Sequence, residues 1–535
     1  MKKLVFACVM SFLCLTAAQL AQAGGPPKDA VSNKALVGSM GPGRVIEVPS
    51  SEFPYVPTAA EIAARERVMA AKAMNLAPPL GPHTTAADVV RPLGTPTDVT
   101  GPQANNSLTI FKTSLISNSS ESTVNEPSVA NAGGKTVETS NWNLFYSSNA
   151  GAGAVVWGNQ NPTAISPGYC CDTQVLYDKD RDLFILMLLD YAGNGASTNG
   201  LTISVSKSLF PSTGPNWCTY KFTGASFGEG STDLLDFAKI AISNSNLYLT
   251  WNDYNPSGNW TATGLARMPL DALYTCSGFS YNYILRNTEF TFALAQQTST
   301  HDQFWWVSNW MTDGTVNGQN LRIFWWPENS GSYSGVTRGI NAYTFGGNNV
   351  CSWCGRLDPR YESVVITPAE YRAQANSAFG GDEVLEVATT SGPGGGDPQN
   401  YVVYNYFHLN SVNYIGSDAT FNTGFSFAYP GCAVNERGYV GCAMVQGNGG
   451  VPGGLIILQD ADSPTQPWGY SFVVGGINAN SNWGDYVVTN PWQPGGGPFQ
   501  TVLWNYNATA GVVNPYYIVW GRGRDKNDYT RWKSK

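Results

Sequence analysis

Residues 482–492, Asn-Trp-Gly-Asp-Tyr-Val-Val-Thr-Asn-Pro-Trp, place an aromatic residue, a glycine, an acid and a phenol directly before a β-branched pair. This order is typical of a loop that runs into a buried strand. Similar loop-to-strand junctions recur from about residue 106 onward, and the seven junctions lie at residues 125–130, 172–177, 236–241, 301–306, 358–362, 429–433 and 485–488. Their mean spacing of about 60 residues indicates a repeated structural unit.

The strands that follow these junctions are continuously apolar, as in Leu183–Leu189 and Leu247–Trp251. Runs of this kind suit strands that are buried on both faces. About four strands in a unit of about 60 residues match a β-propeller blade, and closing the blades into a ring removes exposed sheet edges. The sequence therefore predicts an all-β propeller of about seven four-stranded blades, and the loose boundaries leave six or eight open.

The composition agrees with a strand-and-turn protein, because 58 residues are glycines, 13% are aromatic and only 13% are charged. The net charge is −8, and no cluster of Lys and Arg precedes the short segment Arg522-Gly-Arg524-Asp-Lys526. Nucleic acid is therefore not an expected partner. No stretch after the N-terminus has the length and apolarity of a membrane span, so we expect a soluble monomer.

The N-terminal region divides into two predicted segments. Residues 1–23 have the basic start, apolar run and Ala-Gln-Ala end of a signal peptide, so the chain is expected to be secreted, to the periplasm or the extracellular space. Residues 24–105 are rich in Pro, Ala and Gly and form a mostly irregular extension. It lies against the main domain, is removed as a propeptide, or is an ordered linker without a function of its own. Within it, Thr58 and Glu61 form a capping box that predicts a helix over 58–75. The propeller then spans 106–522, and a polar tail spans 523–535.

Eight cysteines remain after the signal peptide, and an even number in an exported chain predicts disulfide bonds. Cys432 and Cys442 flank a hairpin turn, so they can pair across two adjacent strands. Cys351-Ser-Trp-Cys354 has the spacing of half a zinc site, but the chain contains only three histidines to complete it. Disulfides are therefore the expected state of these cysteines.

Several stretches resemble the blade patterns of large secreted propellers of the sialidase-like, or neuraminidase-repeat-like, group. The resemblance lies in Leu201–Ser206, Trp217–Phe222, Trp251–Tyr254 and Asn482–Tyr486, and it extends over most of residues 120–521. It implies the fold more strongly than the chemistry. The chain lacks the Asp-box turn Ser-x-Asp-x-Gly-x-Thr-Trp of those enzymes. Its Arg356, Arg360 and Arg372 lie close together in the sequence, whereas the three arginines that bind the substrate carboxylate in sialidases come from separate blades. The catalytic residues of sialidases are therefore not assigned to this chain.

In a propeller the innermost strands begin near the central axis, where the loops build a site. The seven junctions bring acids to this rim, namely Glu126, Asp172, Asp236, Asp302, Asp358 and Asp485. Like charges at close range raise one another's pKa. The negative charge of these acids therefore has to be offset by Lys239, Arg356, Arg360, a bound cation or hydrogen bonds from backbone amides. Two of the acids can act on a glycosidic bond, or a few can collect Ca²⁺, and for each acid the alternative is a purely structural tie to the next blade.

Specific candidates follow from this arrangement. Asp172, Asp358 and Asp485 are the candidate catalytic acids, and His301 is a further candidate base for a polysaccharide lyase. The candidate substrate-binding residues are Trp483, Tyr486, Arg356, Arg360, Glu126 and Asp236. Trp483 stands out because a flat aromatic face beside polar groups suits stacking against a sugar ring. At least half of each tryptophan pair, Trp305-Trp306 and Trp325-Trp326, is expected in the core, because neighbours on a strand point to opposite faces.

Asp178, Asp180 and Asp182 have the every-second-residue spacing of a calcium loop, but the segment lacks the turn glycine and closing glutamate and falls where a hairpin turn is needed. No cofactor is required, and Ca²⁺ is the one ion that the sequence suggests. The leading function is binding of an extracellular glycan or polysaccharide at the central face, with cleavage as a glycoside hydrolase or polysaccharide lyase left open. The alternative is a non-catalytic scaffold that recognises protein or peptide through the same face.

Overall fold

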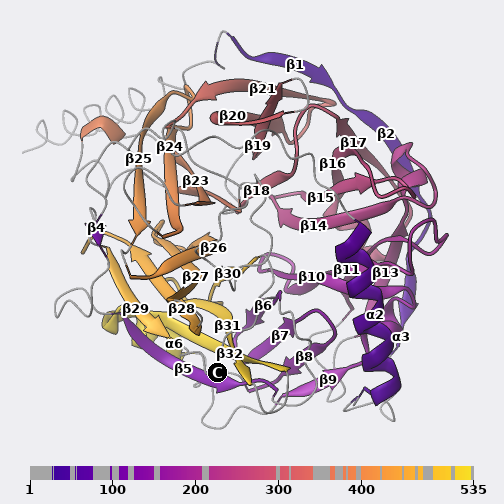
Figure 1. Ribbon diagram of the computed structural model, residues 1–535, viewed down its shortest axis with the longest axis horizontal. Coiled ribbons are helices and arrows are strands. Elements are labelled where there is room, and N and C mark those ends of the chain that lie inside the picture. The colour runs from indigo at the N-terminus through magenta and orange to yellow at the C-terminus, as the bar shows by residue number, and fades with distance from the viewer. Residues whose placement is uncertain are drawn as a thin grey trace, which may run out of the picture.

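The structure is a computed structural model, and it describes residues 27, 29–47, 55, 57–75, 97–98, 108–117, 126–149, 157–207, 216–296, 302–312, 315–341, 362–367, 377–380, 383–392, 399–421, 424–448, 451–463, 468–473, 486–507 and 512–531. The predicted signal peptide lies outside these residues. Strands dominate the described part, and they follow one another around a centre as the blades of a propeller (Figure 1). The predicted all-β propeller fold is confirmed.

Within the described residues the strands fall into seven consecutive antiparallel groups, here called blades 1 to 7. Blade 1 consists of β6 (Ser128–Ala132), β7 (Lys135–Thr139), β8 (Leu144–Ser147) and β9 (Gly158–Gln160), and blade 2 of β10 (Tyr169–Asp178), β11 (Leu183–Asp190), β12 (Gly200–Ser206) and β13 (Trp217–Phe222). Blade 3 consists of β14 (Leu234–Ile242), β15 (Asn246–Tyr254), β16 (Trp260–Pro269) and β17 (Phe279–Arg286). Blade 4 consists of β18 (Phe292–Gln296), β19 (Gln303–Thr312), β20 (Thr315–Pro327) and β21 (Ser332–Gly339).

Blade 5 consists of β22 (Ser363–Thr367), β23 (Val384–Ser391), β24 (Tyr401–His408) and β25 (Tyr414–Phe421). Blade 6 consists of β26 (Ser426–Val434), β27 (Val440–Asn448), β28 (Val451–Gln459) and β29 (Gly469–Val473). Blade 7 consists of β30 (Thr489–Pro491), β31 (Phe499–Asn507) and β32 (Val512–Gly521), together with β5 (Thr109–Leu115). Blades 4 and 5 share one sheet, because β18 and β22 also pair in parallel. Short helices lie between strands, at α3 (Pro162–Ile165), η3 (Gly224–Phe227), α4 (Leu270–Thr275) and η4 (Ser377–Phe379).

The ring is closed by pairing between distant parts of the chain. Strand β5, which precedes blade 1 in sequence, pairs antiparallel with β32 near the C-terminus and becomes the outermost strand of blade 7. Buried apolar clusters also bridge each pair of successive blades, including blade 7 and blade 1. A sheet buried on both faces needs apolar residues at every position of a strand, which explains the continuous apolar runs in the sequence.

The tryptophan pairs show how both faces of a blade are filled. Trp305 and Trp325 face the core between blades 4 and 5, whereas Trp306 and Trp326 face the core between blades 3 and 4. All four side chains are buried. The sequence predicts that at least half of each pair is buried, and in the structure both members of each pair are buried. Neighbouring side chains point to opposite faces of the blade, and each face packs against a core.

The innermost strands are tied to one another by side chains. Apart from β18 and β22, which pair with each other, an innermost strand has a neighbouring strand on one edge only, so the backbone groups on its other edge need different partners. In four places a side chain of one innermost strand bonds the backbone of the next innermost strand. These links join Ser128 to Val175, Gln174 to Ile240, Ser363 to Cys432, and Asn490 to Val129.

The N-terminal extension contains strands that the sequence analysis does not predict. Strands β1 (Val31–Lys34), β2 (Leu36–Met40) and β3 (Arg44–Ile46) pair with the outermost strands of blades 4, 3 and 2 in turn. We call residues 29–47 the N-terminal strap, and Figure 1 shows its indigo strands along the outer edge of the ring. Leu36 and Val37 are both exposed, so the strap has no alternating burial that a sequence pattern could reveal.

The helix predicted over 58–75 is confirmed as α2 (Ala59–Asn75). Its capping box is formed, because the Thr58 backbone N–H donates to Glu61 at 2.7 Å and the Glu61 N–H donates to the Thr58 hydroxyl at 3.2 Å. Arg65 of α2 is buried and donates to the carbonyl of Trp142 at 2.8 Å, which fixes the helix against blade 1. A two-residue strand, β4 (Thr97–Asp98), pairs with β25 of blade 5.

Three disulfides join described cysteines. Cys432 bonds Cys442 across β26 and β27, as predicted. Cys218 on β13 bonds Cys276 at the end of α4, and this bond links blades 2 and 3. The neighbours Cys170 and Cys171 also form a disulfide. Cys351 and Cys354 lie outside the described residues.

Gly38 provides a test of how tightly the strap is held. A methyl group on Gly38 would overlap the Tyr281 ring, and that ring is buried and fixed because its hydroxyl donates to the Ser226 carbonyl. Gly38→Ala is therefore expected to lower the free energy of unfolding by about 1–3 kcal/mol, measured by urea denaturation. Gly41→Ala is the matched control, because nothing lies within 4 Å of its added methyl group and its effect should be near zero. Equal stabilities of the two variants would show that the strap is not seated on blade 3.

Candidate functional site at the mouth of the central channel

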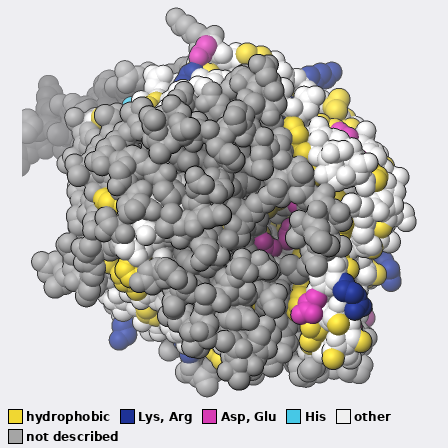
Figure 2. Space-filling model, viewed as in Figure 1, with side chains coloured by type: hydrophobic (Ala, Val, Ile, Leu, Met, Phe, Trp, Pro, Cys, Tyr) yellow, Lys and Arg dark blue, Asp and Glu magenta, His cyan; other side chains and the backbone are white. Residues whose placement is uncertain are grey.

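The innermost strands surround a central channel, and we call the end at which they begin the channel mouth. Residues at this end are Glu126 before β6, Asp172 on β10, Asp236 on β14, Glu362 before β22 and Tyr486 before β30. In the face drawn in Figure 2, Asp or Glu side chains are visible near the centre of the ring. The channel mouth therefore collects side chains from blades that are far apart in sequence.

Three innermost strands bulge as they start from this end. Asp172, Phe237 and Tyr429 have φ values of 43°, 50° and 59°, and each coincides with a register shift against the second strand of its blade. A bulge adds a residue to one strand and re-aims the side chains next to it. Left-handed backbone at residues other than glycine is uncommon and is found preferentially at functional sites.

A cation and two aromatic rings meet inside the mouth. The Lys239 Nζ lies 4.5 Å from the centre of the Phe237 ring and 5.6 Å from that of Tyr486. The Tyr486 hydroxyl donates to the Thr173 carbonyl at 3.2 Å, and its ring is perpendicular to Phe237 at 6.2 Å. Tyr486, which the sequence predicts as a binding residue, therefore joins blade 7 to blades 2 and 3 across the axis.

Three of the acids at the mouth are buried. Glu126, Asp172 and Asp236 are all buried, with exposed fractions of 7%, 5% and 9%. The backbone N–H of Asp172 donates to the Asn141 side chain at 3.1 Å, so blade 1 helps to hold the bulge. Three carboxylates from three blades are therefore buried at one end of the channel.

Glu362 is a mouth residue that the sequence does not single out, because the prediction at this junction is Asp358. Glu362 accepts hydrogen bonds from the Thr390 N–H at 2.9 Å and the Thr390 hydroxyl at 2.8 Å. That hydroxyl accepts in turn from the Tyr429 N–H at the bulge of blade 6. A signal was present, because a Glu shortly before the linking Ser occurs at both Glu126–Ser128 and Glu362–Ser363.

One predicted junction is wrong. Asp302 directly precedes β19, the second strand of blade 4, and it is exposed. The innermost strand of that blade is β18, which begins at Phe292, directly after Thr291 with φ 59°. The strongly apolar run at 304–307 resembles an innermost strand. It belongs instead to the second strand of the blade, which is equally buried. Asp302 therefore belongs to the end of the channel opposite the mouth.

Six other predicted site residues lie outside the described residues, so the structure does not place them. They are the candidate acids and base Asp358, Asp485 and His301, and the candidate binding residues Trp483, Arg356 and Arg360.

The space inside the channel is small. A cavity of about 40 Å³ behind the mouth is lined by Gln174, Lys239, Glu362 and Tyr486, among others. A second cavity of about 120 Å³ lies at the opposite end, next to Asp178, Lys179 and Glu436. Small-molecule sites usually measure about 300–1,000 Å³. A cavity of about 40 Å³ suits water and is too small for a sugar residue.

The predicted calcium hairpin borders the opposite cavity and uses its acids internally. Asp178 accepts from the N–H groups of Asp180 and Arg181, from the Arg181 guanidinium at 3.0 Å and from the Tyr274 hydroxyl at 2.6 Å. Asp182 accepts from the Tyr177 hydroxyl. These bonds complete the turn between β10 and β11, so the carboxylates of Asp178 and Asp182 have a structural role there.

No protein-family model matches the sequence, and no curated protein matches it. Solved structures give weak similarities. Puromycin hydrolase is 11% identical with a TM-score of 0.38, over 72% of this chain and 52% of that one, so the chain spans about half of its length. An α-L-arabinofuranosidase from Fusarium graminearum is 10% identical with a TM-score of 0.40 (66% and 93%), and an exo-β-1,3-galactanase from Phanerochaete chrysosporium is 12% identical with a TM-score of 0.29 (74% and 92%). Similarities this low carry no argument about what the chain does.

Proposed function

We propose that this chain is an exported β-propeller that binds an extracellular glycan or polysaccharide at the channel mouth. The observation that carries the proposal is that Glu362, Lys239 and Tyr486, from three blades, line one cavity behind the mouth, while Glu126, Asp172 and Asp236 are buried at the same end of the channel. Carboxylates accept hydrogen bonds from sugar hydroxyls, a lysine donates to them, and an aromatic ring covers the apolar face of a sugar. The mouth therefore offers each of the three kinds of contact that a carbohydrate uses.

Cleavage is the further step of the same proposal. Glycosidases act with two carboxyl groups on either side of the glycosidic bond, and the separation of the two groups decides between inversion and retention. The proposed acids are Asp172 with Asp358 or Asp485, and Trp483 with Arg356 or Arg360 contributes to sugar binding. His301 is the proposed base in the lyase version of this chemistry.

Export is proposed from the signal-peptide pattern and agrees with the three disulfides, which persist in oxidising compartments. None of the described helices has the length and apolarity needed to cross a membrane.

A panel of polysaccharides tests the proposal. The mature chain is incubated with each one, while affinity electrophoresis measures binding and product assays measure new reducing ends and unsaturated uronates. We expect retention by at least one glycan, with new reducing ends from a hydrolase or unsaturated ends from a lyase. Binding without product would remove the catalytic step and leave a glycan-binding propeller. Neither binding nor product on any glycan would contradict the proposal and favour a propeller that recognises protein or peptide.

A further inference from the structure

Three carboxylates converge at the connection between blades 2 and 3, outside the channel mouth. Glu229 and Asp233 lie in the loop between η3 and β14, and Asp253 lies near the end of β15. One carboxylate oxygen of each residue lies within 4.8 Å of the others. Asp253 is opposite Leu235 in the sheet, so the cluster is built from a loop and the strand beside it.

Two acids of the cluster are buried, and no positive side chain among the described residues is paired with the cluster. Asp253 has an exposed fraction of 0% and Asp233 one of 5%, whereas Glu229 is partly exposed. In the described part of the chain, no Lys or Arg side chain forms an ion pair with any of the three. Three negative charges this close together, in surroundings of low polarity, repel one another strongly.

One carboxylate oxygen of the cluster, Oδ1 of Asp253, accepts no hydrogen bond from any described residue. Asp253 accepts from the Thr261 hydroxyl through Oδ2, but among the described residues nothing donates to its buried Oδ1. A buried carboxylate oxygen without a partner is costly.

The loop holds its acids in fixed positions. Asp233 accepts from the Gly230 N–H at 2.8 Å, and the loop is so tight that a methyl group on Gly230 would overlap the Asp233 carboxylate. Asn199 donates to the Thr232 carbonyl at 3.3 Å, which anchors the loop to blade 2. The carboxylates are therefore oriented before any ligand arrives.

We propose that Glu229, Asp233 and Asp253 bind one Ca²⁺ ion. All three donors are hard oxygen ligands, which Ca²⁺ prefers, and an ion among them would neutralise the cluster and give Asp253 Oδ1 its missing partner. Water molecules complete the coordination on the side of Glu229, which is open to solvent. An extracellular site of this kind has a dissociation constant of about 0.1–1 mM.

The position of the ion gives it a structural effect. Asp233 directly precedes β14, the strand that carries Asp236, Phe237 and Lys239 into the channel mouth. A bound ion ties the loop before β14 to β15 and so fixes the start of that strand. The inference does not depend on the proposed glycan function, because calcium binding is measured without a glycan.

Calcium titration of the mature chain tests the site. After dialysis against a chelator, isothermal titration calorimetry should show one Ca²⁺ bound per chain, and Ca²⁺ at 10 mM should raise the melting temperature by at least about 1 °C. Asp253→Asn should weaken calcium binding by about 100-fold or more and abolish the thermal shift. Without calcium, Asp253→Asn should melt no lower than the wild type, because it removes a buried repulsion.

Asp180→Asn is the matched control, because Asp180 belongs to the hairpin that also has calcium-like spacing. It should keep the full calcium response, whereas loss of the response in Asp180→Asn alone would place the ion at the hairpin and overturn the inference. If Asp253→Asn does not fold, Glu229→Gln at the solvent side serves in its place. A wild type that binds no Ca²⁺ at 10 mM, or that binds it unchanged in Asp253→Asn, would also overturn the inference.

Discussion

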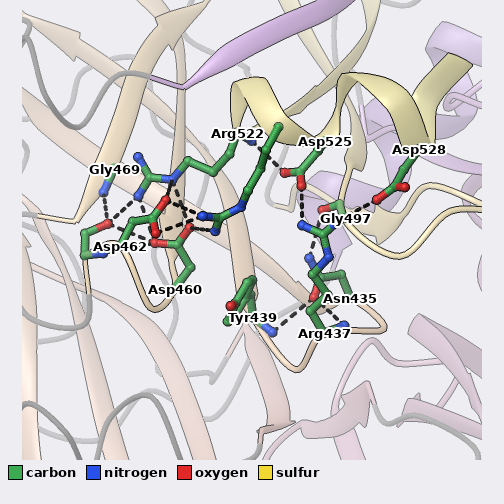
Figure 3. Close-up of polar contacts among 12 residues, drawn as sticks. Asn435, Arg437, Tyr439, Asp460, Asp462, Gly469, Gly497, Arg522, Asp525 and Asp528 are labelled. Atoms are coloured by element: carbon green, nitrogen blue, oxygen red, sulfur yellow. Dashed lines mark hydrogen bonds and ion pairs between the residues drawn. The ribbon is translucent and has the colours of Figure 1, made fainter.

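Replacing Asp460 by asparagine is expected to lower the free energy of unfolding by about 3–5 kcal/mol. Asp460 follows β28 in blade 6, is fully buried, and forms two hydrogen bonds of 2.8 Å with Arg522, which follows β32 in blade 7. Figure 3 shows this pair beside Gly469 and Asp462. Asparagine keeps the shape of the side chain but leaves the buried Arg522 guanidinium without its principal counter-charge, and an uncompensated buried charge is strongly destabilising.

Asp462→Asn is the matched control for this prediction. Asp462 lies in the same turn and pairs with Arg524 at 2.7 Å, but the two side chains are 47% and 44% exposed. An exposed pair contributes about 0–1 kcal/mol, so this variant should unfold nearly like the wild type in urea. Losses of similar size in the two variants would show that the buried pair does not hold blades 6 and 7 together.

The same junction has a second set of ion pairs, which explains how the end of the chain is held. Arg437, in the turn between β26 and β27, pairs with Asp525 of η5 (Gly523–Asp525) and with Asp528 of α6 (Lys526–Arg531) (Figure 3). The sequence suggests only a polar tail over 523–535. In the described part of that segment the polar residues instead make specific contacts with blade 6.

Asp172→Asn is expected to reduce glycan turnover by about 100-fold or more if Asp172 is one of the reacting carboxyl groups. Asparagine is the right replacement because Asp172 has a φ of 43°, and Asn adopts left-handed backbone as readily as Asp. The backbone of the bulge should therefore survive, so the loss reports the missing charge. Turnover is measured on the glycan that gives the most product in the polysaccharide panel.

Asp302→Asn is the control, because Asp302 is exposed at the opposite end of the channel. It should leave turnover unchanged, and the free energy of unfolding of both variants, measured in urea, should equal that of the wild type to within about 1 kcal/mol. Unchanged turnover in a folded Asp172→Asn variant would remove Asp172 from the catalytic group. An equal loss in Asp302→Asn would show that the charge of the whole molecule, and not the channel mouth, controls the reaction.

The sequence reveals features whose causes are local. The capping box of Thr58 and Glu61 lies within four residues, and the Cys432–Cys442 disulfide joins two strands of one hairpin, so both could be predicted. The strap could not, because β1–β3 are held by backbone pairing while side chains such as Val37 stay exposed. The junction at Asp302 fails for a different reason, because the second strand of blade 4 is as apolar as an innermost one.

The candidate sites show the same division. The position of Tyr486 at the channel mouth follows from a recognisable loop-to-strand junction, whereas the surroundings of Lys239 depend on which rings reach it from another blade. The cluster of Glu229, Asp233 and Asp253 has no spacing motif, because two of its acids come from a loop and the third from a neighbouring strand. Contacts across blades follow from ring closure, which no local pattern specifies.

A crystal structure of the mature chain with an oligosaccharide from the best glycan of the panel tests the central claim most directly. The account predicts a sugar residue at the channel mouth, with its hydroxyls bonded to carboxylates such as Asp172 and its apolar face near an aromatic side chain of the mouth. A sugar bound only on the outer edge of the blades, or at the opposite end of the channel beside Lys179 and Glu436, would contradict it.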